Sequence, residues 1–309
     1  MPFRHCSRTS RRDFLKLTGT AAGLTAAGPL AARGWGGEER DPYGGFQMCL
    51  QSYSLRAFDV TTALSHSQKL GLRFWESFPG HIPLSTVPAH VRQHKAMLKD
   101  ANVTLLSYGV VSFDENESKA REVFDFAQVM GLVSISANPK KLPAVFDLLD
   151  KLVQEYQIPI AIHNHGPGAT YDKIDDVVEY TKGRHPFIGA CVDTGHYLRS
   201  NESPVEAIER LGQRVFGVHL KDAKSIRDPH ELERLAKVLP EGAANRLRKE
   251  GKIMTILGEG ELDVVGCLKV LRRNGFDRSL SLEYEENPEN PLSDIEVCLN
   301  TVREAVRLL

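Results

Sequence analysis

Residues 187–196 read FIGACVDTGH, an apolar run that ends in an aspartate, a threonine, a glycine and a histidine. A run that is apolar throughout is typical of a strand buried on both faces, as in a parallel sheet. Asp193 and His196 come at the carboxyl end of this run. Functional groups of α/β proteins gather at the carboxyl ends of parallel strands. The stretch therefore predicts the fold class, α/β, and also where the site lies.

Seven further apolar runs predict, together with Phe187–Asp193, a total of eight strands. They are Phe46–Gln51, Leu72–Glu76, Val103–Ser107, Val133–Ala137, Ile158–His163, Val215–His219 and Leu280–Glu283. Amphipathic stretches that predict helices lie between them, among them Val87–Asp100, Ser118–Met130 and Leu142–Tyr156. Eight units of a strand followed by a helix fit either a closed barrel or an open doubly wound sheet.

The closed barrel is the better prediction. The first strand is not followed by the G-x-G-x-x-G pattern of nucleotide-binding open sheets, and barrels often run to about 250 residues as one domain. We therefore expect residues 46–309 to form a single-domain (β/α)8 TIM barrel. Residues 222–258 interrupt the alternation after the seventh strand, and their pattern is charged and partly helical. At that place in a barrel they predict a lid-like insertion over the mouth.

The amino terminus has the pattern of an export signal. Ser10–Lys16 contains an arginine pair and precedes a stretch up to Ala32 that is too short and too polar for a stable membrane span. This pattern resembles a twin-arginine signal peptide, which we assign to residues 1–34, with residues 35–45 as a linker. The resemblance implies a periplasmic or extracytoplasmic protein that folds before export and has no stable membrane insertion.

Composition and charge exclude some partners. The 309 residues carry a formal net charge of −1, with 41% hydrophobic and 26% charged residues, which is ordinary for a soluble globular protein. Binding to nucleic acid needs a surplus of Lys and Arg, so we expect no nucleic-acid partner. The five cysteines form no C-x-x-C pair, and Cys49 and Cys191 lie in predicted strands, as small buried apolar residues do.

Imidazoles and charged groups gather at the ends of the last four predicted strands. In chain order they are His163, His165, Asp193, His196, His219, Lys221, Glu283 and Glu285. A barrel brings these strand ends to one face. Burying two imidazoles with two carboxylates is costly unless a cation compensates them. The mixed nitrogen and oxygen set predicts one divalent metal ion, and it suits Mn²⁺, Co²⁺, Zn²⁺ or Fe²⁺ better than Ca²⁺.

Three of these segments resemble motifs of the xylose-isomerase-like TIM barrel superfamily, in its sugar phosphate isomerase/epimerase family. They are Asp193–His196, His219–Asp222 and Glu283–Glu285, with weaker support from Gln51–Leu55 and Gly258–Gly260. The resemblance covers Phe46 to the carboxyl terminus. It implies that Asp193, His219 and Glu283 bind the metal and that His196 binds substrate. The family's fourth ligand is usually a glutamate on strand five, where this chain has His163, which we assign as the replacement.

That replacement changes the expected chemistry. The family's epimerases use two metal-bound glutamates, on strands five and eight, on opposite faces of the substrate carbon. Because only Glu283 of the pair is present, we expect a one-base reaction, either isomerisation of a sugar carbonyl or elimination next to it. Glu283 is the first candidate for the base. The further catalytic candidates are His165 and Lys221, although Lys221 has an alternative as an ion-pair partner of Asp222 or Glu285. The substrate-binding candidates are His196, Arg199 and Glu285.

The expected partner is a small carbohydrate. Export and the lack of a glycine-rich phosphate motif favour an unphosphorylated sugar or a keto-glycoside. Three alternatives stay open: a sugar epimerase with His163 as its second base, a non-catalytic sugar-binding barrel, and a metal-dependent hydrolase or endonuclease. The net charge and the export pattern disfavour the last of these. The sequence does not decide whether the barrel forms a dimer.

Overall fold

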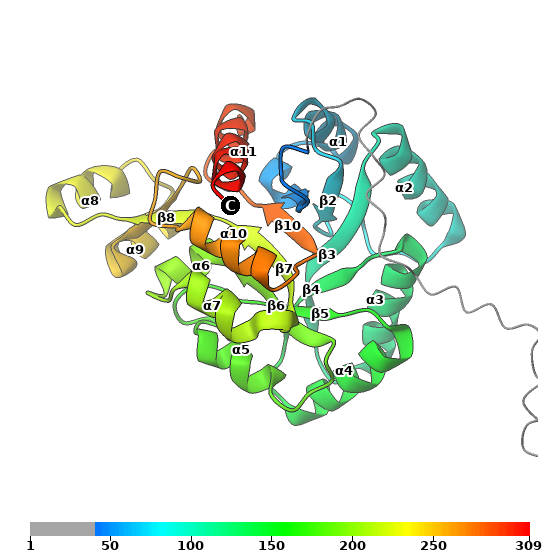
Figure 1. Ribbon diagram of the computed structural model, residues 1–309. Coiled ribbons are helices and arrows are strands. Elements are labelled where there is room, and N and C mark those ends of the chain that lie inside the picture. The colour runs from blue at the N-terminus through cyan, green and yellow to red at the C-terminus, as the bar shows by residue number, and fades with distance from the viewer. Residues whose placement is uncertain (1–40) are drawn as a thin grey trace, which may run out of the picture. The chain divides into compact units, whose positions relative to one another are not determined.

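The computed structural model describes residues 41–309, and in this part of the chain eight parallel strands close into a barrel (Figure 1). The strands are β1 (Gln47–Gln51), β2 (Phe74–Ser77), β3 (Thr104–Phe113), β4 (Ser134–Pro139), β5 (Ile160–His163), β6 (Ile188–Asp193), β7 (Val215–Leu220) and β10 (Ser279–Leu282). Each pairs with the next barrel strand, and β10 closes the ring on β1, with Ser279 opposite Gln47. The predicted (β/α)8 barrel is confirmed, and the open sheet is excluded.

Helices follow the strands and surround the barrel (Figure 1). They are α1 (Val60–Lys69), α2 (Pro88–Asp100), α3 (Glu117–Met130), α4 (Pro143–Tyr156), α5 (Ile174–Thr181), α6 (Thr194–Arg199), α7 (Pro204–Leu211), α10 (Val264–Arg273) and α11 (Leu292–Arg307). In α4, Val145, Leu149 and Val153 recur at helical spacing and are fully buried. The side chain of Asn116 caps the start of α3, and Gly131 ends it with φ of 77°.

The barrel interior contains a polar layer. Its buried serines are Ser107, Ser134, Ser136, Ser279 and Ser281. β2 places the fully buried side chain of Glu76 among them, and Ser136 and Ser281 each donate a hydrogen bond to its carboxylate at 2.6 Å. An ionised carboxylate is costly to bury without such donors. The interior therefore holds a charge to which the sequence analysis gave no role.

Residues 222–258 form a small unit at the carboxyl end of β7. β8 (Asp222–Ser225) and β9 (Lys252–Thr255) pair antiparallel, and α8 (Pro229–Ala236) and α9 (Glu241–Glu250) lie between them. Figure 1 shows this unit extending from the ring of barrel helices. Four of its buried apolar residues form a cluster of their own, namely Ile226, Ala236, Ala244 and Leu247, while Ala223 and Leu257 join the barrel core. The insertion therefore keeps its shape partly through its own core.

Asp222 fixes the segment that follows the insertion. Its buried carboxylate accepts the backbone amides of Ala223, Gly258, Gly260 and Leu262 at 2.8, 2.9, 3.0 and 2.9 Å. A Cβ at Gly260 would lie 2.2 Å from Oδ1 of Asp222, so only glycine allows the backbone to approach the carboxylate this closely. The Gly-Glu-Gly motif seen in the sequence is therefore explained by backbone packing.

We expect Asp222→Ala to lower the free energy of unfolding by about 3 kcal/mol, because it leaves several buried amides without an acceptor. Asp263→Ala is the matched control. Asp263 accepts one amide, that of Gly266, at the exposed start of α10, and its loss should cost about 1 kcal/mol. Denaturant unfolding measures both values, and equal losses would contradict this account of Asp222.

The described chain begins with a turn packed on the barrel. The carboxylate of Asp41 accepts the amides of Tyr43 and Gly45 at 3.0 and 2.5 Å, and Tyr43 is buried in the core. The carboxyl end of the assigned linker therefore contacts the barrel. The signal peptide assigned to residues 1–34 and the rest of the linker lie outside the described residues and stay predictions. Among residues 41–309, no helix is long and apolar enough to cross a membrane.

Candidate functional site

A cavity of about 500 Å³ lies where the barrel strands end. Seven of the nine predicted site residues line it, namely His163, His165, His196, Arg199, Lys221, Glu283 and Glu285. The other two, Asp193 and His219, are buried next to them. Residues of α9 and β9, among them Ala243 and Met254, also line the cavity. The structure therefore brings all nine residues together beside the insertion, while their roles stay predictions.

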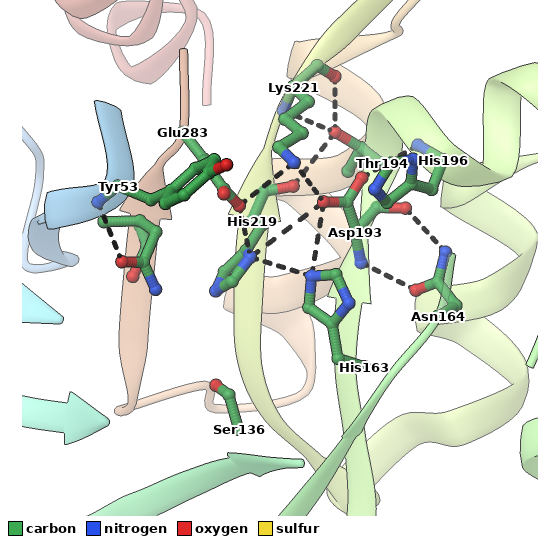
Figure 2. Close-up of polar contacts among 12 residues, drawn as sticks. Tyr53, Ser136, His163, Asn164, Asp193, Thr194, His196, His219, Lys221 and Glu283 are labelled. Carbon is green, nitrogen blue, oxygen red and sulfur yellow. Dashed lines mark hydrogen bonds and ion pairs between the residues drawn. The ribbon is translucent and has the colours of Figure 1, made fainter. Parts of the chain in front are cut away.

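Four of these side chains direct potential ligand atoms at one another (Figure 2). Nε2 of His163 lies 3.0 Å from Nδ1 of His219 and 3.4 Å from Oδ2 of Asp193. Oε2 of Glu283 lies 2.7 Å from Nδ1 of His219. Ligand atoms held tetrahedrally at about 2.1 Å from one ion are about 3.4 Å apart. The four atoms, all within 4.8 Å of one another, thus have the spacing that a small divalent ion needs.

Local structure directs Asp193 toward this cluster. Asp193 ends β6 and caps α6, where its Oδ1 accepts the amide of His196 at 2.8 Å. The side chain of Asn164 donates to the carbonyl of Asp193 and accepts its amide, at 2.9 and 2.8 Å. Because the cap uses Oδ1, Oδ2 faces the cluster. The Asp-Thr-Gly-His motif therefore combines a helix cap with a carboxylate oxygen that faces the cluster.

Lys221 lies directly against the two carboxylates of the cluster. Thr194 Oγ1 donates to the carbonyl of Lys221 at 2.6 Å and accepts its amide at 2.9 Å, which joins the ends of β6 and β7. Nζ of Lys221 lies 3.2 Å from Oδ2 of Asp193, 3.1 Å from Oε2 of Glu283 and 2.5 Å from Oε1 of Glu285. Burial alone would lower the pKa of Lys221, but these carboxylates raise it well above its usual value. The side chain of Lys221 therefore stays protonated and acts only as a hydrogen-bond donor.

The cluster has a surplus of negative charge. Three carboxylates, of Glu76, Asp193 and Glu283, are buried here against the single ammonium of Lys221, which leaves two negative charges when His219 is neutral. The surplus of negative charge also changes the pKa of His219. Burial alone would lower the pKa of His219, but its acidic neighbours raise it well above the usual value. A divalent cation would neutralise this surplus.

Two carboxylate oxygens of the cluster lack an aligned donor. Oδ2 of Asp193 and Oε2 of Glu283 are buried and make no hydrogen bond with any described residue. Burial would raise the pKa of both groups. The neighbouring side chains of His196 and Lys221 nevertheless lower the pKa of Asp193. Those of Lys221 and His219 lower the pKa of Glu283. Both are therefore ionised. Ionised oxygens that face imidazole nitrogens fit a divalent metal of the Mn²⁺, Co²⁺ or Zn²⁺ class.

Two further histidines lie beside the cavity as neutral rings. Burial lowers the pKa of His165 to about 4 and that of His196 well below its usual value. Nη1 of Arg199 lies 3.1 Å from Nδ1 of His196. A guanidinium only donates, so Nδ1 accepts and the proton of His196 is on Nε2. His196 therefore offers an N–H, whereas neutral His165 offers a nitrogen that accepts a proton.

Arg199 is held by the insertion. Its Nε and Nη2 donate to the carboxylate of Glu250 at 2.7 and 2.8 Å, and the two side chains are only 13% and 6% exposed. Its third contact is with His196. Since the protein itself uses these donors, the geometry favours a positioning role for Arg199 over the substrate-binding role expected from the sequence.

We expect Glu250→Gln to make cleavage of the insertion by a protease several-fold faster, because it removes one charge from a nearly buried ion pair. Glu233→Gln is the matched control, since Glu233 makes a similar two-bond pair with Arg248, both at 3.0 Å, on the exposed side of the insertion. Exposed pairs contribute little. Limited proteolysis with mass spectrometry locates the cuts. Equal cleavage rates for both variants would contradict the role of Arg199 and Glu250.

The sequence analysis missed several residues of the site. Glu76 closes the predicted strand Leu72–Glu76, so the strand-end criterion that selected His163 would have found it. Glu250 had no comparable signal, because its contact depends on how the insertion folds back. Tyr53 and Phe78 also line the cavity, with ring centroids 5.4 Å apart. Tyr53 follows β1, in the segment Gln51–Leu55 that supported the family resemblance but was given no role in the site, and Phe78 follows β2.

The chain resembles known proteins over much of its length. A family model described as "Xylose isomerase-like TIM barrel" matches residues 64–301. Inosose dehydratase from Clostridium botulinum (strain Eklund 17B / Type B) is 30% identical over 148 residues, which is 47% of this chain and 47% of that protein. The chain thus spans about half the length of the curated relatives it matches.

Two solved structures show the same fold. The probable 3-DHS dehydratase AsbF of Bacillus anthracis, involved in petrobactin synthesis, has a TM-score of 0.62 and 16% identity, over 83% of this chain and 98% of that one. The structure of the IolI protein with a binding zinc atom has a TM-score of 0.60 and 15% identity, over 85% of this chain and 99% of that one. Identities this low establish a common fold alone.

Proposed function

Since the chain belongs to the xylose isomerase-like TIM barrel family, we propose that it is a metal-dependent lyase or isomerase acting next to the carbonyl of an unphosphorylated sugar or keto-glycoside. The observation that carries this proposal is the cluster of His163, Asp193, His219 and Glu283 at the cavity, beside the neutral ring of His165. Two similar proteins are named dehydratases, and dehydration is an elimination. This favours the lyase over the isomerase.

The four cluster residues would hold the ion, which when bound supplies a Lewis acid that polarises a carbonyl and acidifies the neighbouring C–H. Two imidazole nitrogens and two carboxylates suit Mn²⁺, Co²⁺ or Zn²⁺. The zinc atom of the IolI structure is in keeping with such a set.

We assign the role of base to His165. Glu283 was the first candidate from the sequence, but Lys221 and His219 lower the pKa of its carboxylate despite its burial. The pKa of His165 is lowered by burial only to about 4. Glu283 also directs a carboxylate oxygen at the proposed ion, whereas the ring of His165 lies outside the four ligand atoms, so His165 keeps a nitrogen available to accept a proton. His165 also lines the cavity, where it meets the substrate.

The residues then divide the reaction among them. His165 takes the proton from the carbon next to the carbonyl, and the electron pair of that C–H bond forms the new C=C bond. The leaving oxygen departs with its own bonding pair, and protonated His165 returns the proton to it, which yields water or an alcohol. The Nε2–H of His196 donates a hydrogen bond to the oxygen that gains negative charge. The ammonium of Lys221, which pairs with Asp193, Glu283 and Glu285, positions those carboxylates.

The charges at the cavity favour an unphosphorylated substrate. Of the four cations that line the cavity, Lys221 is paired with carboxylates, Arg199 with Glu250 and Lys252 with Glu261, so among the described residues only Arg246 meets a phosphate without an ion pair. Glu283 and Glu285 at the same wall would repel one. A cavity of about 500 Å³ is within the usual range for small-molecule sites, and Tyr53 offers an aromatic surface to a sugar ring or an aglycone.

The experiment uses 4-nitrophenyl 3-keto-glucopyranoside in D₂O with the Mn²⁺-loaded chain. The carbonyl lies at carbon 3 and the leaving group at carbon 1, so the proton lost is that of carbon 2. Release of nitrophenol together with the carbon 1–carbon 2 unsaturated ketone, which carries no hydrogen at carbon 2, supports the lyase. Deuterium at carbon 2 of a glycoside that keeps its nitrophenol supports the isomerase or a two-base epimerase. Binding without release or exchange overturns the proposal in favour of a sugar-binding barrel.

A further inference from the structure

The carboxylate of Glu76 has no role in the reaction described above. It is fully buried in the barrel interior and does not line the cavity. β2 carries it toward His219 on β7, which is not a neighbour of β2 in the sheet. Hydroxyls from β4 and β10, those of Ser136 and Ser281, each donate to it at 2.6 Å. Residues of four strands thus meet around one buried charge. Neither apolar packing nor contact with the substrate requires that charge.

The ring of His219 lies between two carboxylates. Its Nε2 is 3.1 Å from Oε1 of Glu76, toward the interior, and its Nδ1 is 2.7 Å from Oε2 of Glu283, toward the cavity. Neither contact is aligned as a hydrogen bond among the described residues. Figure 2 shows Lys221 on one side of this ring and Ser136, which donates to Glu76, on the other. Each nitrogen therefore has a carboxylate that attracts a proton to it.

The choice between the two nitrogens decides whether His219 is able to bind a metal. A histidine that binds a metal is neutral and carries one proton, and any second proton leaves when the ion binds. With its one proton on Nδ1, the ring donates to Glu283 and offers the cluster no lone pair. With it on Nε2, the lone pair of Nδ1 faces the cluster. The sulfur of Cys191 is also near His219, but sulfur is a weak acceptor compared with a carboxylate.

We propose that Glu76 is a positioning residue of the metal centre: its carboxylate accepts the Nε2 proton of His219 and so directs the lone pair of Nδ1 at the ion. The inference rests on the metal centre of the proposed function. Metal-binding histidines commonly donate their second N–H to a carboxylate, which fixes the ring and strengthens the ligand. An apolar residue would fill the same interior volume without the cost of a buried charge.

The test compares the affinity for Co²⁺ of the parent chain, Glu76→Gln and Glu285→Gln, followed by the visible absorption of the bound ion. Glutamine keeps the shape of Glu76 and removes its charge, and the dissociation constant should rise about 10- to 100-fold. Glu285→Gln removes a charge that is 33% exposed and pairs with Lys221, so the expected rise is no more than about threefold. Equal affinity of parent and Glu76→Gln overturns the inference, and so does an equal loss in both variants.

A second measurement needs no metal. Nitrogen NMR of the metal-free chain, labelled at histidine, follows exchange of the Nε2 proton of His219 with solvent. This exchange should be slow in the parent and at least about tenfold faster in Glu76→Gln, because the ionised acceptor is gone. If the parent fails to bind Co²⁺, the metal centre of the proposed function is wrong. The exchange rates still decide the role of Glu76, which equal rates in both chains would overturn.

Discussion

Replacing His165 with alanine is expected to lower kcat by about 10²- to 10⁴-fold, the usual contribution of a general base, while the metal content stays at that of the parent chain. The reason is geometric. His165 lines the cavity, but its ring is not among the four side chains that direct ligand atoms at one another. Steady-state kinetics with the keto-glycoside, together with elemental analysis of the same preparation, measures both quantities.

Two variants complete this experiment. His90→Ala, an exposed histidine of α2, should leave kcat unchanged. Glu283→Gln should lower both the turnover and the metal content, because Glu283 is assigned as a ligand. Normal turnover of His165→Ala would contradict the assignment of the base. If Glu283→Gln then kept its metal and lost its turnover, Glu283 would be the base, as the sequence first indicated.

Removing the metal with a chelator is expected to abolish turnover and to lower the melting temperature by about 8 °C. An ion present at about a thousand times its dissociation constant stabilises the folded chain by about 4 kcal/mol, and each kcal/mol corresponds to about 2 °C for a domain of this size. Without the ion, Lys221 is the one lysine or arginine of the described residues that lies against both Asp193 and Glu283. Calorimetry and kinetics before and after chelation measure the two effects.

Adding a metal ion back to the chelated chain is the control for this experiment. Adding back Mn²⁺, Co²⁺ or Zn²⁺ should recover both turnover and melting temperature, whereas Ca²⁺ should not, because it prefers more oxygen ligands than this set provides. In Asp193→Ala, which lacks a ligand, the chelator should leave the melting temperature unchanged. Full turnover of the parent after complete removal of the ion would show that the reaction does not depend on it.

The local pattern of apolar and polar residues predicted most of the fold. Buried parallel strands are apolar on both faces, so runs such as Ile158–His163 are visible in the sequence, and amphipathic spacing marks helices such as α4. The insertion was visible because it breaks the alternation. The strand pairing inside the insertion could not be predicted, because it joins Asp222 of β8 to Thr255 of β9 across the whole segment. Such long-range pairing leaves no local signal in the sequence.

The site was predictable where barrel topology places it and unpredictable where distant side chains meet. The strand-end rule selected eight of the nine residues that the structure brings together, all of them except Arg199. It gave no sign that Glu250 holds Arg199, or that Glu76 faces His219 in the barrel interior. Those contacts depend on the register of non-adjacent strands and on how the insertion folds back, which a single sequence does not encode locally.

The central claim is that His163, Asp193, His219 and Glu283 together hold one divalent ion. Elemental analysis tests it most directly, on the parent chain and on His163→Ala, both purified without chelator. The account predicts about one ion per chain in the parent and a marked loss in the variant. A full ion in both would mean that His163 is not a ligand, which would leave it available as the second base of an epimerase. No ion in either would contradict the claim itself and leave a sugar-binding barrel as the better description.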